Sequence, residues 1–194
     1  MMRHPLSLAA ALVLCALPLT ACGASSQAQQ TSQTATTSPT APQLGEGIFA
    51  SPDDADRADA DSTAEVAALM LHSWDTTTDR TETAAAIRTK PLMSADWAAH
   101  QVEPERNAGG APWIAAAQHQ GYSVPSIIPA PGDVSRDVAP DKAIRAYTVE
   151  WTWTTRDGAT IHDTGRRQIT LYLEEHDGQW SVVGHQSRAM GEAR

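Results

Sequence analysis

Cys22 is the residue whose type and position most clearly indicate chemistry. It follows Leu19-Thr20-Ala21 at the end of an apolar run that extends from Leu6, and the only preceding arginine or lysine is Arg3. The run is well short of the roughly 20 residues that a transmembrane helix needs, and it is typical of the core of an export signal. The sequence therefore predicts an exported chain with a reactive thiol at the end of its signal.

The stretch Leu19-Thr20-Ala21-Cys22 resembles the bacterial lipobox. That resemblance implies a diacylglycerol on the Cys22 thiol and removal of residues 1–21 as the signal peptide. Two or more acyl chains anchor a protein stably, so we expect a lipid anchor at the extracytoplasmic face of the cell membrane. The alternative is an ordinary secretory signal with a chance cysteine. A disulfide within the mature chain does not fit, because the other cysteine, Cys15, lies inside the signal.

Residues 22–61 are expected to be a disordered tether. They are rich in Ser, Thr, Gln, Ala and Pro, with one short apolar stretch, LGEGIFA, at 44–50. Such a composition cannot bury enough apolar surface to offset the entropy of ordering. The acidic end of the tether, residues 51–61, lacks the alternating ligands and the turn glycine of a calcium loop, so we interpret it as a solvated charge run.

Residues 62–194 are long enough for one domain with a hydrophobic core. The chain holds 23 acidic residues and 14 lysines and arginines, a formal net charge of −9, and loss of Arg3 makes the mature chain more negative still. This charge argues against nucleic acid and against an anionic membrane surface as partners. The membrane contact that we expect is the lipid anchor alone.

Helix signals occupy the first half of that domain. Ser62 and Glu65 have the spacing of a capping box, followed by an apolar face that ends at Trp74. A second helix is expected up to Lys90, before Pro91, and a third piece from Ser94 towards Val102. A fourth starts near Pro112 and stops at Gly121. These helices are short, so we expect them to bury their apolar faces against a sheet.

Strand signals occupy the second half. In residues 142–158, Tyr147, Val149, Trp151 and Trp153 alternate with polar residues, which is the pattern of a strand buried on one face. Two further strands are expected around Ile169 to Leu173 and in QWSVVGHQS, joined by tight turns at the Asp-Gly pairs 157–158 and 177–178, with Gly165 at a bend or bulge. A further strand is expected at 122–128. The fold class is therefore α+β, with short N-terminal helices packed on a curved antiparallel sheet.

This order of elements, with aromatic inner faces on long hairpins, resembles the nuclear-transport-factor-2-like superfamily over residues 62–186. LHSWDTTTDR, at 71–80, is also similar to small actinobacterial lipoproteins and envelope proteins with this domain. The resemblance implies a cone-shaped fold that serves in different members as an enzyme pocket, a ligand-binding module or a scaffold, including scaffolds of secretion and conjugation machines. Such a fold does not by itself select a function.

The resemblance places a candidate pocket between the helices and the sheet. A ketosteroid-isomerase-like enzyme needs a carboxylate base and proton donors aimed at a carbonyl oxygen, which Asp75 and Tyr147 could supply. The alternative is that the tryptophans of this region have no ligand and only fill the hydrophobic core. Zinc, nucleotide and hydrolase signatures are absent from the sequence, and we expect no metal and no cofactor. The candidate pocket residues are Trp74, Asp75, Trp97, His100, Tyr147, Trp151, Trp153 and His185.

Two functions from different classes remain open. The first, which we favour, is a non-catalytic interaction or assembly module of an envelope complex of the secretion, conjugation or transport type, with an envelope protein as partner. The second is a small apolar ligand-binding or isomerase/cyclase-like pocket protein. A filled cone with an apolar patch or a bare strand edge would favour the first function, and an empty cavity with a buried carboxylate would favour the second.

Overall fold

The protein was analysed as a computed structural model that describes residues 49–190 except 107–108, 133 and 163. The predicted signal, Cys22 and most of the predicted tether therefore lie outside the described residues. The helical elements are the 3-10 turns η1 (Pro52–Asp54) and η2 (Lys90–Leu92) and the helices α1 (Ala60–Met70), α2 (Thr83–Arg88), α3 (Ala95–Ala99) and α4 (Ala111–Gln118). The strands are β1 (Tyr122–Pro129), β2 (Arg136–Ala139), β3 (Lys142–Thr154), β4 (Thr164–His176) and β5 (Gln179–Ala189).

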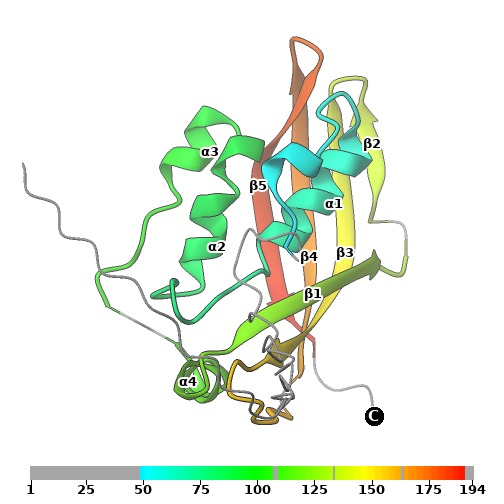
Figure 1. Cartoon of the computed structure of the whole chain (residues 1–194). Helices are drawn as coiled ribbons and strands as arrows, with labels where there is room; N and C mark the ends of the chain where they lie inside the picture. Colours follow the sequence, from blue (N-terminus) through cyan, green and yellow to red (C-terminus); the bar gives the residue numbers. More distant parts are fainter. Residues whose placement is uncertain (1–48, 107–108, 133, 163, 191–194) are drawn as a thin grey trace, which may run out of the picture. The chain divides into compact units, whose positions relative to one another are not determined.

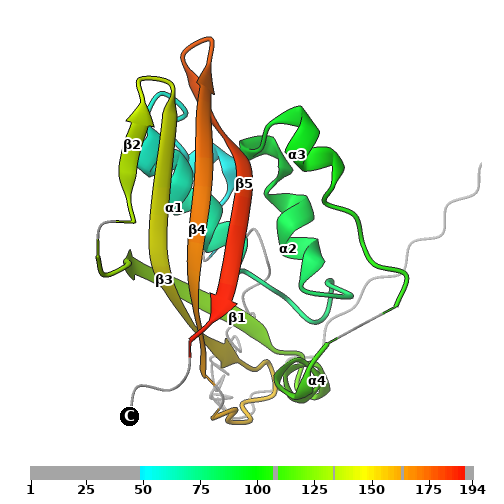
Figure 2. The same ribbon diagram turned by 180° about the vertical axis from the view of Figure 1, so that it is seen from behind.

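The strands form one antiparallel sheet in the order β1-β3-β4-β5, with β2 paired to the start of β3. Helix α1 lies on one face of this curved sheet, whereas α2 and α3 lie beside β5 in both Figure 1 and the reverse view in Figure 2. The expected α+β class and the meander of three long strands are confirmed. The short strand β2 was not expected, because RDVA is too brief to show a periodicity.

Alternating side chains of β3 and β4 build the core against α1. Val149, Ile169, Leu171 and Leu173 are buried, as the period-two pattern predicts, and α1 packs on all four long strands. Burying an apolar side chain of this size stabilises the fold by about 1.5–3 kcal/mol. None of the helices within the described residues is both long enough and apolar enough to cross a membrane.

The two Asp-Gly pairs play different structural roles. Asp177 and Gly178 both have positive φ and join β4 directly to β5, as the tight-turn pattern predicts. The pair at 157–158 instead lies within a longer connection between Thr154 and Thr164, so the prediction of a tight turn there was wrong. Arg156, in this connection, turns back towards β1 and helps to explain its length.

Gly165 is neither a bend nor a bulge. It pairs in regular register with Trp151, and a Cβ built on it would lie 1.9 Å from two indole carbons of Trp151. Only a residue without a side chain lets the backbone of β4 approach this ring so closely. The register shifts lie elsewhere, between β4 and β5 at Tyr172 and Leu173 and between β2 and β3 at Asp137 and Ala139.

The folded region starts earlier than the predicted tether boundary at residue 61. Helix α1 begins at Ala60 with Asp59 as its N-cap, whose side chain accepts from the Ser62 N–H, so Ser62 is not the cap. Phe49 is buried against the ring of Tyr122. The acidic run is not a purely solvated charge run either, because Arg57 within it is hydrogen-bonded to β5. Single anchoring residues such as Phe49 and Arg57 do not alter the composition from which the tether was inferred.

Candidate functional site

The space between the helices and the sheet is filled by an aromatic cluster. Trp74 stands edge-on to Trp151, with ring centroids 5.2 Å apart, and stacks on Trp153 at 6.3 Å. Trp113 of α4 closes the cluster edge-on against Trp153, and His72 contacts both Trp74 and Trp151. These rings belong to the hydrophobic core and are almost fully buried. The core interpretation of the predicted tryptophans is the one that this packing favours.

Asp75 forms a buried ion pair. Its carboxylate accepts from Arg156 at 2.6 and 3.0 Å and from the backbone and hydroxyl of Thr77. Burial alone would raise the pKa of Asp75, but these hydrogen bonds outweigh burial and hold the pKa below its ordinary value. The guanidinium of Arg156 also lies over the ring of Tyr122, at the start of β1. Asp75 is thus held as an ionised anchor of a strand, which does not suit a general base that must take up a proton.

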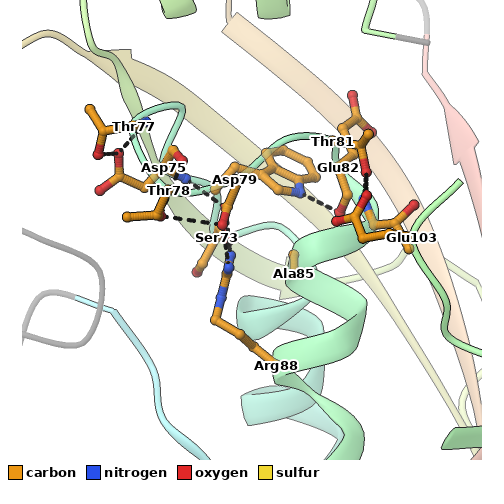
Figure 3. A network of polar contacts seen from close by, with 12 residues as sticks. Ser73, Asp75, Thr77, Thr78, Asp79, Thr81, Glu82, Ala85, Arg88 and Glu103 are labelled. Carbon is orange, nitrogen blue, oxygen red and sulfur yellow. Dashed lines mark hydrogen bonds and ion pairs between the residues drawn. The ribbon is translucent and has the colours of Figure 1, made fainter. Parts of the chain in front are cut away.

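A second carboxylate in the same loop is held by a different arginine, as Figure 3 shows. Asp79 accepts from both terminal nitrogens of Arg88, which reaches it from α2, and from the N–H of Asp75. Arg88 also donates to the carbonyl oxygen of Ser73. Asp79 therefore fixes the 73–79 loop against α2, whose N-cap position is occupied by Glu82.

A cavity of about 230 Å³ remains beside the aromatic cluster, between α1, α2 and the ends of β4 and β5. Arg167 projects into it and is held by Glu82 at 2.7 and 3.2 Å, with its guanidinium over the rings of Trp74 and Trp151. His72 lines the cavity, and burial lowers its pKa to about 4, so the ring is neutral at pH 7. The cavity is small, and its lining is mixed, with apolar and polar side chains in similar share.

Trp97 and His185 meet as predicted, at the rim of this cavity. The indole N–H of Trp97 donates to Nδ1 of His185 at 3.3 Å, which places the remaining proton of a neutral ring on Nε2. Burial lowers the pKa of His185. These two residues therefore form a fixed neutral pair that joins α3 to β5.

Of the other predicted pocket residues, His100 contacts the Trp97 ring, with ring centroids 6.1 Å apart, but does not line the cavity. His100 is exposed and its Nδ1 is bonded to the carbonyl oxygen of Asp96 on its own helix. Tyr147 is buried in the middle of β3, where burial and the nearby Glu65 and Asp61 raise its pKa. The predicted set is thus not one pocket, and Tyr147 and Asp75 do not converge on a common cavity.

Sequence analysis missed three residues of the region. His72, Arg156 and Arg167 each contact the buried ring or carboxylate that it did predict. Arg167 left a signal, because it occupies an inward position of β4 in step with Ile169. The other two left none. Among the described residues no group of three or more His, Cys, Asp or Glu side chains is arranged to hold a metal ion.

The outer edge of β1 is closed. The segment 72–76 runs beside the start of the strand, where the Ser123 N–H donates to Trp74 O and the Thr76 N–H donates to Gly121 O. Further along, every second N–H points outward, and two of those positions are Pro125 and Pro129, which have no N–H. An edge of this kind cannot readily pair with another strand.

The outer edge of β5 is closed only along its first half. The Trp180 N–H donates to Arg57 O, the Trp180 carbonyl accepts from the Arg57 guanidinium, and Val182 O accepts from the Ser94 N–H. The Met190 N–H points inward, to Arg166 O, so by alternation the N–H groups of His185, Ser187 and Ala189 point outward. No backbone hydrogen bond from the described part of the chain reaches these three groups. The second half of β5 is an open strand edge.

Comparisons with known proteins add little to this geometry. No protein-family model and no curated protein sequence matches the chain. One solved structure to which it is similar comes from Xanthomonas campestris and is described as a calcium/calmodulin dependent protein kinase II association domain. The two are 18% identical, the match covers 68% of this chain and 81% of that one, and the TM-score is 0.34. At this TM-score the likeness supports no conclusion about the present chain.

Proposed function

We propose that the chain is a lipoprotein anchored through Cys22 at the extracytoplasmic face of a cell membrane, and that its folded domain is a non-catalytic interaction module of an envelope complex. The domain is inferred to be a nuclear-transport-factor-2-like cone of the actinobacterial lipoprotein type. The envelope complex would be of the secretion, conjugation or transport type, and the partner an envelope protein. The lipobox and the preceding apolar run support the anchor.

The observation that carries the interaction function is the open second half of the β5 edge. Unpaired backbone N–H and C=O groups on a sheet edge are a template for pairing with another chain, and folded proteins usually cover or blunt them. The same molecule covers the β1 edge with the 72–76 segment and two prolines. Because the β1 edge is covered and the second half of the β5 edge is not, we infer that a partner binds to the β5 edge.

The filled interior supports a non-catalytic role. Trp74, Trp151 and Trp153 occupy the space that a ligand would need, and Asp75 is committed to Arg156. The alternative, a small apolar ligand-binding or isomerase-like pocket, needs an apolar cavity with an available carboxylate. The cavity beside Arg167 is small and mixed in polarity, and its one carboxylate, Glu82, is paired.

The anchor is tested by fractionating cells that make the wild-type chain or Cys22→Ser. We expect the wild type in the membrane fraction, and Cys22→Ser either released or retained as an uncleaved precursor, because the thiol that carries the lipid is gone. A correctly cleaved Cys22→Ser chain that stays in the membrane would contradict the anchor.

The interaction role is tested by chemical cross-linking in intact cells followed by identification of attached proteins. The double variant Asp75→Asn with Arg156→Gln removes both members of the buried pair, and so removes the Asp75 carboxylate without leaving one charge alone. We expect this variant, if folded, to capture the same partner and to retain cellular function. Loss of function with folding, lipidation and partner capture intact would instead indicate carboxylate-dependent chemistry.

A further inference from the structure

The second half of β5, from His185 to Ala189, combines three properties in one short segment. Its outward N–H groups make no recorded backbone bond within the described chain, its residues from Gln186 to Ala189 are exposed, and it contains no proline. We propose that this edge binds an extended, acidic segment of a partner protein as an additional strand of the sheet. The inference rests on the proposed interaction function, and it specifies the surface and the chemistry of the partner.

Backbone from elsewhere in the chain already occupies the first half of the same edge. Met93 forms a parallel bridge with Val182, and the Ser94 N–H donates to the Val182 carbonyl. After Ser94 the chain turns into α3, which contacts β5 through Trp97 and His185 but forms no backbone hydrogen bond with it among the described residues. An incoming strand would therefore extend a row of hydrogen bonds that Arg57 and Met93 to Ser94 begin, without displacing any of them. Main-chain bonds of this kind supply affinity in strand addition.

The charge of this segment favours an acidic partner. Strand β5 contains no Asp or Glu, and its single charged residue is Arg188. Arg188 donates to the side-chain oxygen of Gln168 and has no carboxylate partner among the described residues. The neighbouring Arg166 and Arg167 are each paired with one glutamate, Glu150 and Glu82, so the local surface keeps one uncompensated positive charge. A carboxylate opposite Arg188 would form the favourable cross-strand pair that is now missing.

The net charge of −9 does not oppose this assignment. Exposed charges are screened over about 8 Å at physiological ionic strength, so the groups beside Arg188 decide the local preference. A basic segment would be attracted to other parts of the acidic surface and repelled here. Charge complementarity of this kind selects the partner and its position more than it adds affinity.

Arg188 also disfavours the binding of a second copy of the chain to this edge. Antiparallel pairing of two β5 edges would bring two Arg188 side chains and two strongly acidic domains together. A charged residue on an edge strand is a common protection against such self-pairing. Arg188 thus disfavours pairing between two copies of the chain and favours the binding of an acidic segment.

The surface is tested with a photoreactive benzophenone amino acid in place of Gln186, in the full-length chain in the cells that make it. Gln186 is exposed on the open edge, and Ser126, exposed on the closed edge strand β1, is the matched control position. We expect irradiation to attach one acidic peptide segment at position 186, identified by mass spectrometry, and at least tenfold less of it at position 126.

Two pairs of variants test the chemistry, with the yield of that cross-link as the readout. Ser187→Pro removes one outward N–H and should lower the yield at least about tenfold, whereas Ser187→Ala keeps the N–H and should change it less than about twofold. Arg188→Gln should lower the yield about three- to tenfold. Its control is Arg136→Gln, an exposed arginine on β2, which should leave the yield unchanged.

Other outcomes overturn the inference, and they separate it from the proposed function. If chemical cross-linking captures a partner but position 186 attaches nothing, a basic segment or a second copy, the edge assignment fails and the interaction function stands. Equal yields for Ser187→Pro and Ser187→Ala would also overturn it, provided that both variants keep the thermal unfolding midpoint of the wild type. If no partner is captured by any route, the proposed function itself fails.

Discussion

The two edges of the sheet are treated in opposite ways. Strand β1 is closed by the 72–76 segment, by the Asp75 to Arg156 ion pair behind Tyr122, and by two prolines. Strand β5 is clamped by Arg57 and by Ser94 along its first half and then left open. The difference indicates that residues at the β1 edge serve mainly stability, whereas the outward backbone N–H groups from His185 to Ala189 are available for binding. Each prediction below would sharpen or break that division.

The largest effect is expected from Asp75→Asn. The change removes the carboxylate from a buried arginine at the closed edge, which costs about 3–5 kcal/mol when one member of such a pair is lost. Urea unfolding at pH 7 measures it, and Arg188→Gln at the open edge, expected within about 0.5 kcal/mol of wild type, is the control. A decrease in the free energy of unfolding of less than about 1 kcal/mol for Asp75→Asn would show that the ion pair does not stabilise the β1 edge.

The next largest effect concerns pH, through His72 in the segment that closes β1. Burial lowers its pKa from 6.5 to about 4, so between these values the unfolded chain binds more protons than the folded one. Stability is therefore complete above pH 6.5 and falls as the pH drops towards 4, by about 2–3 kcal/mol.

Urea unfolding of wild type and His72→Gln between pH 7 and pH 4.5 measures this term. The difference in the free energy of unfolding between wild type and His72→Gln should decrease as the pH falls, since the variant has no imidazole to protonate. A constant difference would show that His72 is not buried as a neutral ring. Because His185 is lowered in the same direction, its own contribution remains in both proteins and cancels.

A smaller effect is expected from Arg57→Gln at the clamped half of β5. The guanidinium donates to Trp180 O, Pro91 O and the Ser181 hydroxyl, and losing these bonds should cost about 2 kcal/mol. Amide hydrogen exchange should accelerate at Trp180 and Val182 and stay unchanged at Ser187, which is already unpaired. An equal acceleration of amide exchange at Ser187 would show that the structure of the open half of β5 depends on the Arg57 hydrogen bonds.

The smallest effect is expected from Ser187→Pro on stability. Its N–H points away from the sheet, so no ladder bond is lost and the unfolding free energy should change by less than about 1 kcal/mol. A proline at Gln186, whose N–H points inward, is the matched contrast and should cost about 3 kcal/mol or more. Similar losses for both would mean that the assigned direction of these N–H groups is wrong.

Local patterns in the sequence determined the α+β class and most element positions. Val149, Trp151 and Trp153 alternate with polar residues because β3 has one buried face, and Asp177-Gly178 forms its turn because both residues tolerate positive φ. Ser94 caps α3, the helical piece that the sequence predicts to start at this residue. Such properties depend on neighbours in the chain, which the sequence displays directly. The predictions for Cys22 and the tether before Phe49 rest on the sequence alone.

The tertiary structure decided what the candidate residues do. Trp74 and Asp75 are adjacent in the sequence, yet one fills the core and the other binds Arg156, 81 positions away. The folding of residues 49–61 depends on Phe49 and Arg57 reaching Tyr122 and β5. Likewise, QWSVVGHQSRA does not reveal which half of β5 is covered, because Arg57 and Ser94 arrive from distant segments. Long-range pairing carries no local periodicity, so only the folded chain separates an anchored edge from an open one.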